Sequence, residues 1–308
     1  MRYLLSIFVL LMGISMAHSQ DNTSDLTPYE IAQQRIADVA ESSVTELRLN
    51  NLQLTQVPPE IGNLTNLTEL YLHSNDLTSL PPEIGNLTNL VSLSLYSNEL
   101  TSLPPEFGNL NNLTGVSLSD NALTSLPPEI GNLNNLITLY LDYNELTSLP
   151  PEFGNLNSLT YLTMYDNDLT SLPSEFGNLS NLTHLILEDN DLTSLSPEIG
   201  NLSNLRVLNL EDNDLARLPS PIGNLTNLEI LSMDDMLWEQ IPDEIRSIND
   251  HASRTQAVVA YMRNQAQWHL RRMLGSAVLM GAGIITVILL LVRRRRLGRK
   301  PKQKRGES

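Results

Sequence analysis

Leucines recur at a fixed interval along most of this chain, the interval that separates Leu67 from Leu90 and Leu90 from Leu113. From residue 44 to about 250, each period follows L-x-x-L-x-L-x-x-N-x-L and then T-x-L-P-x-E-[I/F]-G-N-L. The wording LTSLPPEIGNLTN at residues 77–89 returns nearly unchanged at 100–112 and 123–135. Such self-similarity indicates an array of structural repeats. Nine repeats follow one another without insertion or deletion, and they begin at Val44, Leu67, Leu90, Leu113, Leu136, Leu159, Leu182, Leu205 and Leu228.

The first half of each repeat predicts a short β-strand, because L-x-L alternates with a period of two and places leucines on one side. A single strand cannot bury that side. Stacked repeats can, with their strands in a parallel sheet and their leucines in a continuous core. On the return path, Pro81-Pro82 and their equivalents prevent a second hydrogen-bonded strand, and Gly85 permits a turn that a side chain would obstruct. We therefore predict an α/β solenoid.

An asparagine fills the ninth position of seven consecutive repeats. Its amide has donors and an acceptor, so it can satisfy backbone groups where the chain turns away from the strand. Its return in every one of these repeats predicts a ladder of such bonds, formed by Asn75, Asn98, Asn121, Asn144, Asn167, Asn190 and Asn213.

With these motifs the sequence resembles the leucine-rich repeat family over residues 44–250. The LxxLPxEIGNLxNL wording is similar to the typical 23-residue class of bacterial proteins and of plant and animal Ras-group proteins. The resemblance implies a horseshoe whose parallel sheet lines the concave side. It also implies that partners bind on that concave face.

Both ends of the array depart from the pattern, since Leu52 and Met236 replace the ladder asparagine. An exposed terminal core needs a cap. Within residues 20–43, the run Thr27-Pro28-Tyr29-Glu30 predicts an N-cap, a proline at the first helical position and a capping-box glutamate. Within residues 251–272, Thr255 to Gln265 predicts a second helix, which resembles the closing helix of bacterial leucine-rich repeat proteins.

Two apolar segments flank the array. Residues 1–19 have the arginine, the apolar run and the small residues of a secretory signal peptide cleaved before Gln20, with an uncleaved anchor as the alternative. The segment 273–292 carries no charge and is long enough for a transmembrane helix. The alternatives for this segment are a buried soluble helix and a cleaved sorting signal, although no LPxTG-like motif precedes it.

Charge is distributed very unevenly. Residues 20–270 contain 34 acidic residues against 7 arginines and no lysine, whereas residues 293–308 contain 9 basic residues against 1 glutamate. Because Lys and Arg beside a span stay in the cytoplasm, we expect a cell-membrane protein with its repeats outside and a basic cytoplasmic tail. The acidic body argues against nucleic acid as a partner. The absence of cysteine excludes disulfides and, together with the closing helix, favours a bacterial exported protein.

Residues that vary between repeats indicate where a partner binds. In the seventh and eighth positions the side chains change from neutral to acidic toward the C-terminus, and tyrosines gather in the middle repeats. The candidate partner-binding residues on the concave face are Tyr71, His73, Tyr96, Tyr140, Asp142, Tyr143, Tyr161, Tyr165, Asp166, Glu188, Asp189, Glu211 and Asp212.

Three interpretations of this acidic face stay open. It is a solvated surface that keeps the protein soluble, a docking surface with tyrosine anchors and a basic protein or peptide partner, or a calcium site built from stacked carboxylates. No EF-hand-type loop supports the last. We expect no cofactor and no metal.

Catalysis has little support, because the sequence contains no nucleophile elbow, phosphate loop or HExxH motif. N-glycosylation motifs matter only in a eukaryotic secretory pathway; they start at Asn22, Asn63, Asn66, Asn86, Asn112, Asn178, Asn181, Asn201 and Asn224. The expected function is non-catalytic recognition or adhesion by a membrane-anchored ectodomain. A structural envelope scaffold without a specific ligand is the alternative.

Overall fold

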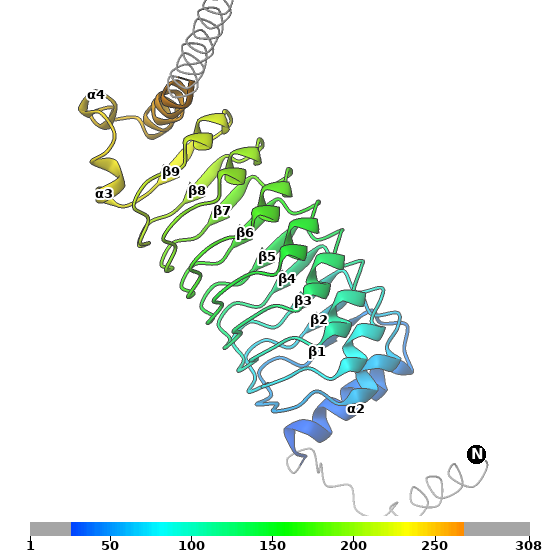
Figure 1. Cartoon of the computed structure of the whole chain (residues 1–308). Coiled ribbons are helices and arrows are strands. Elements are labelled where there is room, and N and C mark those ends of the chain that lie inside the picture. Colours follow the sequence, from blue (N-terminus) through cyan, green and yellow to red (C-terminus); the bar gives the residue numbers. More distant parts are fainter. Residues whose placement is uncertain (1–25, 268–308) are drawn as a thin grey trace, which may run out of the picture. The chain divides into compact units, whose positions relative to one another are not determined.

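The computed structural model describes residues 26–267 (Figure 1). The expected signal peptide, transmembrane segment and basic tail lie outside these residues. Within residues 26–267, no helix combines the length and the apolar character needed to cross a membrane. The chain divides after Leu169 into two compact units, here called the N-terminal unit and the C-terminal unit.

Parallel strands from successive repeats form the sheet of the N-terminal unit. Leu93 pairs with Val116 and Leu70 with Leu93, so each strand centre lies beside the equivalent residue of the next repeat. The described elements of this unit are α2 (Pro28–Ala40), β1 (Glu46–Arg48), β2 (Glu69–Tyr71), β3 (Ser92–Ser94), β4 (Gly115–Ser117), β5 (Thr138–Tyr140) and β6 (Tyr161–Thr163).

Each return path contains a five-residue 3₁₀ turn. The turn starts at or after the proline of L-P-x-E, which fixes the backbone there, and its apolar residue points into the core. Phe107 and Phe153 are fully buried in this way, as are the isoleucines of neighbouring turns. The turns of the N-terminal unit are η2 (Pro59–Asn63), η3 (Pro82–Asn86), η4 (Pro105–Asn109), η5 (Pro128–Asn132) and η6 (Pro151–Asn155).

The turn glycines are required by close packing between repeats. None of the glycines in the described residues has a positive φ, so the left-handed conformations open to glycine are not used. A Cβ on Gly108 would instead lie 2.5 Å from the Glu129 carbonyl oxygen of the following turn. Gly85 and Gly131 face the same obstacle. The expected obstruction is real, but it comes from the next repeat.

Helix α2 packs on the first repeat. The expected capping box is present, because the Thr27 side chain accepts a bond from the Glu30 amide and the Glu30 carboxylate accepts one from the Thr27 amide. Ala32 and Ile36 are buried beneath the helix. Arg35 Nη1 donates to the Arg48 carbonyl, 2.8 Å away, at the end of β1.

The C-terminal unit repeats the same design. It contains η7 (Ser174–Asn178), β7 (His184–Ile186), η8 (Pro197–Asn201), β8 (Val207–Asn209), η9 (Ser220–Asn224), β9 (Ile230–Ser232), α3 (Asp235–Trp238) and α4 (Asp243–Arg246). Residues 251–267 are helical and follow α4.

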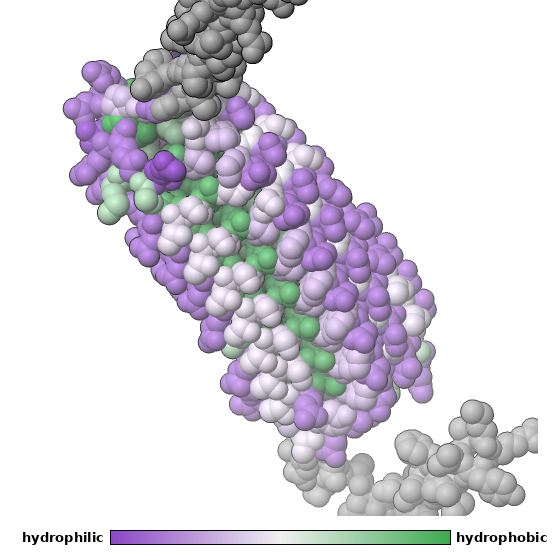
Figure 2. All heavy atoms as spheres, viewed as in Figure 1, coloured by the Kyte–Doolittle hydropathy of each residue, from purple (hydrophilic) through white to green (hydrophobic). Residues whose placement is uncertain are grey.

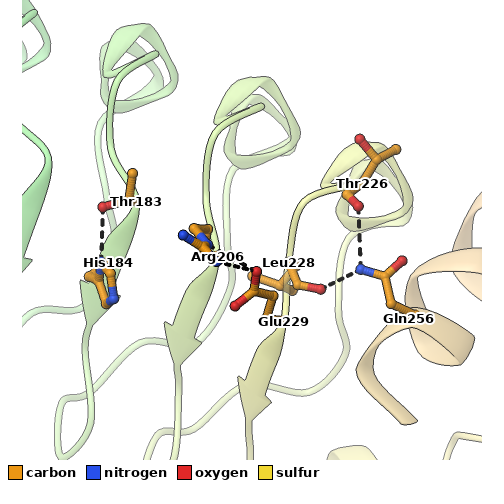
Figure 3. Close-up of polar contacts among 7 residues, drawn as sticks. All are labelled: Thr183, His184, Arg206, Thr226, Leu228, Glu229 and Gln256. Carbon is orange, nitrogen blue, oxygen red and sulfur yellow. Dashed lines mark hydrogen bonds and ion pairs between the residues drawn. The ribbon is translucent and has the colours of Figure 1, made fainter. Parts of the chain in front are cut away.

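The helix at residues 251–267 takes the place of a tenth repeat. A Cβ on Gly223 would collide with the Arg263 backbone nitrogen, just as the earlier glycines meet the following turn. Gln256 Nε2 donates to the carbonyls of Leu228 and Thr226, at 2.5 and 3.3 Å (Figure 3). The Leu231 amide donates to Thr255 Oγ1. These bonds satisfy backbone groups of the last repeat.

Gly108→Ala should lower the unfolding free energy by about 1–3 kcal/mol, the usual cost of forcing a methyl group into occupied space. Gly115→Ala is the matched control, because its Cβ would lie 3.3 Å from the movable Thr138 hydroxyl and should change stability by about 0.5 kcal/mol at most. Denaturant unfolding of the full-length protein measures both. Equal losses would contradict the close-packing argument.

Candidate binding surface

Positions three, five and seven of each repeat lie on the side of the sheet away from the buried leucines, and we call this side the strand face. In β2 to β5 the central residue is at most 1 % exposed, whereas its neighbours are partly or fully exposed. All but four of the candidate binding residues lie on the strand face. Tyr143, Asp166, Asp189 and Asp212 occupy the eighth position, one residue further along.

In repeats one to three, aromatic and basic side chains contact one another. The Arg48 guanidinium lies 4.5 Å from the centre of the Tyr71 ring. The Tyr71 hydroxyl donates to Glu69 at 2.6 Å, and this bond raises the pKa of the phenol. His73 stacks on Tyr96, with ring centres 4.4 Å apart, and burial lowers the pKa of the imidazole.

Repeats five and six carry four tyrosines, Tyr140, Tyr143, Tyr161 and Tyr165, which we call the tyrosine cluster. The rings of Tyr140 and Tyr161 are 5.7 Å apart, and those of Tyr143 and Tyr165 meet edge to face at 4.8 Å. Tyr140 and Tyr143 are 38 % and 49 % exposed. A hydrogen bond with Tyr143 raises the pKa of Tyr165 to about 12, so its phenol is neutral at physiological pH.

Asp142 lies beneath this cluster. Only 5 % of the residue is exposed. Its carboxylate accepts bonds from the Thr163 hydroxyl at 2.7 Å, the Ser119 hydroxyl at 3.2 Å and the Tyr165 amide at 3.2 Å. Burial raises the pKa of the carboxyl group, while these three donors pull the pKa down. Asp142 therefore positions Tyr165 from below and joins three repeats.

A backbone constraint accounts for many acidic residues at the eighth position. From the second repeat to the eighth this residue has φ between 53° and 57°, the left-handed region, which Asn and Asp tolerate better than other non-glycine residues. Sequence reasoning missed this constraint. Tyr143 is the exception, because every other eighth-position residue in this conformation is Asn, Asp or Ser. The residues are Asn51, Ser74, Ser97, Asp120, Tyr143, Asp166, Asp189 and Asp212.

In the C-terminal unit the acidic side chains accept hydrogen bonds from an asparagine amide and from the backbone. The Asn209 amide donates to Glu188 at 2.7 Å, and the Asp212 backbone amide donates to Asp234 at 2.7 Å. Burial, followed by the charges of Glu188, Asp212 and Asp234, raises the pKa of Glu211. Arg206 and Glu229, from neighbouring repeats, form an ion pair beside this face (Figure 3).

The ninth-position asparagines bond to the backbone of neighbouring repeats. Asn144 donates to the carbonyls of Leu118 and Leu141 at 3.1 and 3.0 Å, and its oxygen accepts from the Leu123 amide at 3.0 Å. Asn75, Asn98, Asn121, Asn167 and Asn213 make equivalent contacts, and Asn190 donates to the Leu187 carbonyl.

The structure contains a second asparagine ladder, which sequence reasoning missed. The last asparagine of NLTN, NLNN or NLSN donates to a carbonyl just after the turn of the preceding repeat, at 2.8 Å in each case. Asn112 is one of the glycosylation motifs, and its amide nitrogen is used in this way. The invariant asparagine at the end of this repeated motif is the sequence feature that could have indicated the second ladder. The donors are Asn89, Asn112, Asn135, Asn204 and Asn227.

Metal-binding geometry is not found in the part of the chain described here: no three His, Asp or Glu side chains between residues 26 and 267 form a group that could hold an ion. On the face drawn in Figure 2, polar residues dominate and hydrophobic residues form only a narrow band. A partner of that face would therefore meet mostly polar surface.

Models of two protein families match the sequence. "Leucine rich repeat" matches residues 65–123, 88–144 and 111–169, and "Leucine-rich repeat region" matches residues 174–250. Together these matches cover more than half of the chain. No curated protein matches.

Solved structures similar to this chain include receptors and bacterial proteins. A plant peptide hormone receptor, RGFR1 in complex with RGF2, is 33 % identical over 65 % of this chain, with a TM-score of 0.59. Internalin C2 from Listeria monocytogenes is 26 % identical over 68 % of this chain and 94 % of its own, with a TM-score of 0.57. A chain of the Drosophila Toll–Spatzle complex is 29 % identical over 63 % of this chain, with a TM-score of 0.55.

The matches differ in how much of the other protein they cover. This chain spans 33 % of the matched plant receptor chain and 28 % of the Toll–Spatzle chain. Both of these structures are complexes, of RGFR1 with RGF2 and of Toll with Spatzle.

Asp142→Asn should change the pH dependence of stability. Because the folded protein raises the pKa of Asp142 above its ordinary value of 3.8, the folded state binds that proton more tightly, and stability from this group is lost as pH rises above 3.8 and through the raised pKa of the folded state. Asparagine has no such loss, and its oxygen and amide can bond to the Tyr165 amide and the two hydroxyls. The melting temperature of the variant relative to wild type should therefore rise from pH 4 to pH 7. A constant or falling difference would contradict this.

Proposed function

This chain belongs to the leucine-rich repeat family, and we propose that it is a non-catalytic recognition protein whose strand face binds a protein or peptide partner. The single observation that carries the proposal is the tyrosine cluster. Its exposed rings contribute little to the core, and one of them holds an unfavourable backbone conformation. Large aromatic side chains on an exposed, ordered surface are the usual anchors of protein interfaces. The receptor complexes similar to this chain support the same assignment.

The partner we propose is basic, because the surrounding surface is acidic. The exposed carboxylates of Asp120 and Asp166 lie at the eighth position of the repeats on either side of Tyr143, and the C-terminal unit adds Glu188, Asp189, Glu211 and Asp212. Complementary charge steers encounter and selects among partners. Nucleic acid does not fit such a surface.

We place this binding surface outside the cell. In this proposal residues 1–19 direct export, residues 273–292 span the membrane, and the basic tail at residues 293–308 stays in the cytoplasm.

The second candidate function is a structural spacer of the cell envelope. It is favoured by the left-handed eighth position, which explains the acidic residues Asp120, Asp166, Asp189 and Asp212 without any ligand. It does not explain why Tyr143 occupies the same position.

Site-specific photocrosslinking separates the two functions. A benzophenone amino acid replacing Tyr140, on the strand face, should give a discrete crosslinked product in the native cell. The same group replacing Glu106, an exposed residue of turn η4 on the return path, is the control and should give none. The spacer function predicts no discrete product at Tyr140, or equal products at both sites.

The topology has its own test, made simple by the absence of cysteine. A membrane-impermeant maleimide should label Ser247→Cys in intact cells and label Ser308→Cys only after permeabilisation. Ser247 is exposed, so its labelling does not depend on unfolding. Labelling of Ser308→Cys in intact cells would contradict the proposed orientation.

A further inference from the structure

The tyrosine cluster conflicts with the local rules of the fold, and Tyr143 is the clearest case. Its φ of 54° lies in the left-handed region, which costs a non-glycine residue roughly 1–2 kcal/mol. Asn, Asp or Ser holds this conformation at the same position of the repeats around it. Since the Tyr143 ring is 49 % exposed, burial in the core does not account for its presence.

The cluster is also held in place. Asp142 fixes the Tyr165 backbone through its amide, and Thr163 and Ser119 hold the Asp142 carboxylate. The edge-to-face contact then orients Tyr143 against Tyr165. A partner therefore meets rings that are already ordered, which reduces the entropy lost on binding.

No cation of the N-terminal unit serves this cluster. Between residues 26 and 169 the only basic residues other than histidine are Arg35 and Arg48. Arg35 donates to the Arg48 carbonyl, and Arg48 contacts Glu46 and the Tyr71 ring. Both belong to the capping helix and the first repeat. Asp120 and Asp166 occupy the eighth position of the repeats before and after that of Tyr143, and both residues are exposed.

Exposed phenol rings beside carboxylates favour a cation as ligand. The face of an aromatic ring attracts positive charge, and the carboxylates add a second attraction. Arginine suits this arrangement better than lysine, because its planar guanidinium stacks on rings and bonds to carboxylates in the same pose. Neighbouring strand-face residues Ser117, Ser119 and Thr138 carry hydroxyls, so the site offers no apolar pocket for an aliphatic side chain.

We propose that the tyrosine cluster binds an arginine side chain of the partner, with the guanidinium on an exposed ring, that of Tyr140 or Tyr143, and paired with Asp120 or Asp166. This inference rests on the proposed function and specifies its ligand chemistry. The Arg48–Tyr71 contact shows the same pairing within this protein, at 4.5 Å.

The test measures binding of labelled tetrapeptides to the full-length protein at about 0.15 M salt, where long-range attraction is largely screened. Acetyl-(Arg)4-amide should bind at least about three times more tightly than acetyl-(Lys)4-amide. The peptide in which neutral citrulline replaces each arginine should bind far more weakly. Equal binding of the citrulline peptide would overturn the proposal, because it would show a site for a neutral ligand.

Tyr143→Asn should lower the affinity for the arginine peptide by about 3- to 10-fold, the range expected for loss of a cation–π contact. Asparagine holds the same backbone conformation in the first repeat at Asn51, so the variant should fold. Tyr140→Ser is the second variant, since Ser94 and Ser117 occupy that position in other repeats. Its affinity should fall in the same range.

Glu106→Gln is the matched control. It removes a negative charge from exposed turn η4, on the return path of the same unit and away from the strand face. Its affinity should stay within about twofold of wild type, as expected for a screened charge. If the control variant lowers affinity while both tyrosine variants keep it, the peptide binds by bulk charge and the proposal fails. If the Tyr140 crosslink forms but the preference for arginine is absent, only the proposed arginine site fails. If the Tyr140 crosslink does not form, the proposed function itself fails.

Discussion

No repeat of this chain can bury its leucines by itself, and this constraint governs the rest of the structure. Each strand is short and pairs with the strands of the repeats before and after it. Its leucines are covered by the repeats on either side, whose turns approach so closely that only glycine fits between them. Stability of this kind is carried by contacts between neighbouring repeats. The strand-face side chains lie outside this leucine core, which leaves them free to vary.

Where the array ends, other elements supply what a neighbour would. Helix α2 buries Ala32 and Ile36 against the first repeat. At the other end, the backbone of Arg263 lies against Gly223, and Gln256 bonds to carbonyls of the last repeat. Helices can do this because a terminal repeat needs only cover for its leucines and hydrogen-bond donors for its carbonyls. The element that supplies them does not have to be a strand.

Repeat spacing was enough to predict the strands and their parallel pairing, and the run Thr27 to Glu30 was enough to predict the capping box, because each depends on spacing or on local side-chain chemistry. It could not reveal what depends on backbone conformation. From the sequence, Asp120 and Asp166 look like ordinary acidic surface residues, yet both also adopt the left-handed backbone conformation that this position requires. Asp142 read as another acidic contact, yet it lies beneath the surface and supports Tyr165. The sequence does not distinguish these three carboxylates, and only their positions in space do.

Stacking between repeats is the central claim, and hydrogen exchange in an Asn144→Ala variant tests it most directly. Asn144 joins repeats four and five through Leu118, Leu123 and Leu141. The variant should therefore exchange faster at residues 113–135, in the preceding repeat, as well as in its own repeat. Asn135→Ala, which removes one exposed bond, should leave both repeats protected. Faster exchange confined to residues 136–158 would contradict the claim that each repeat depends on its neighbours.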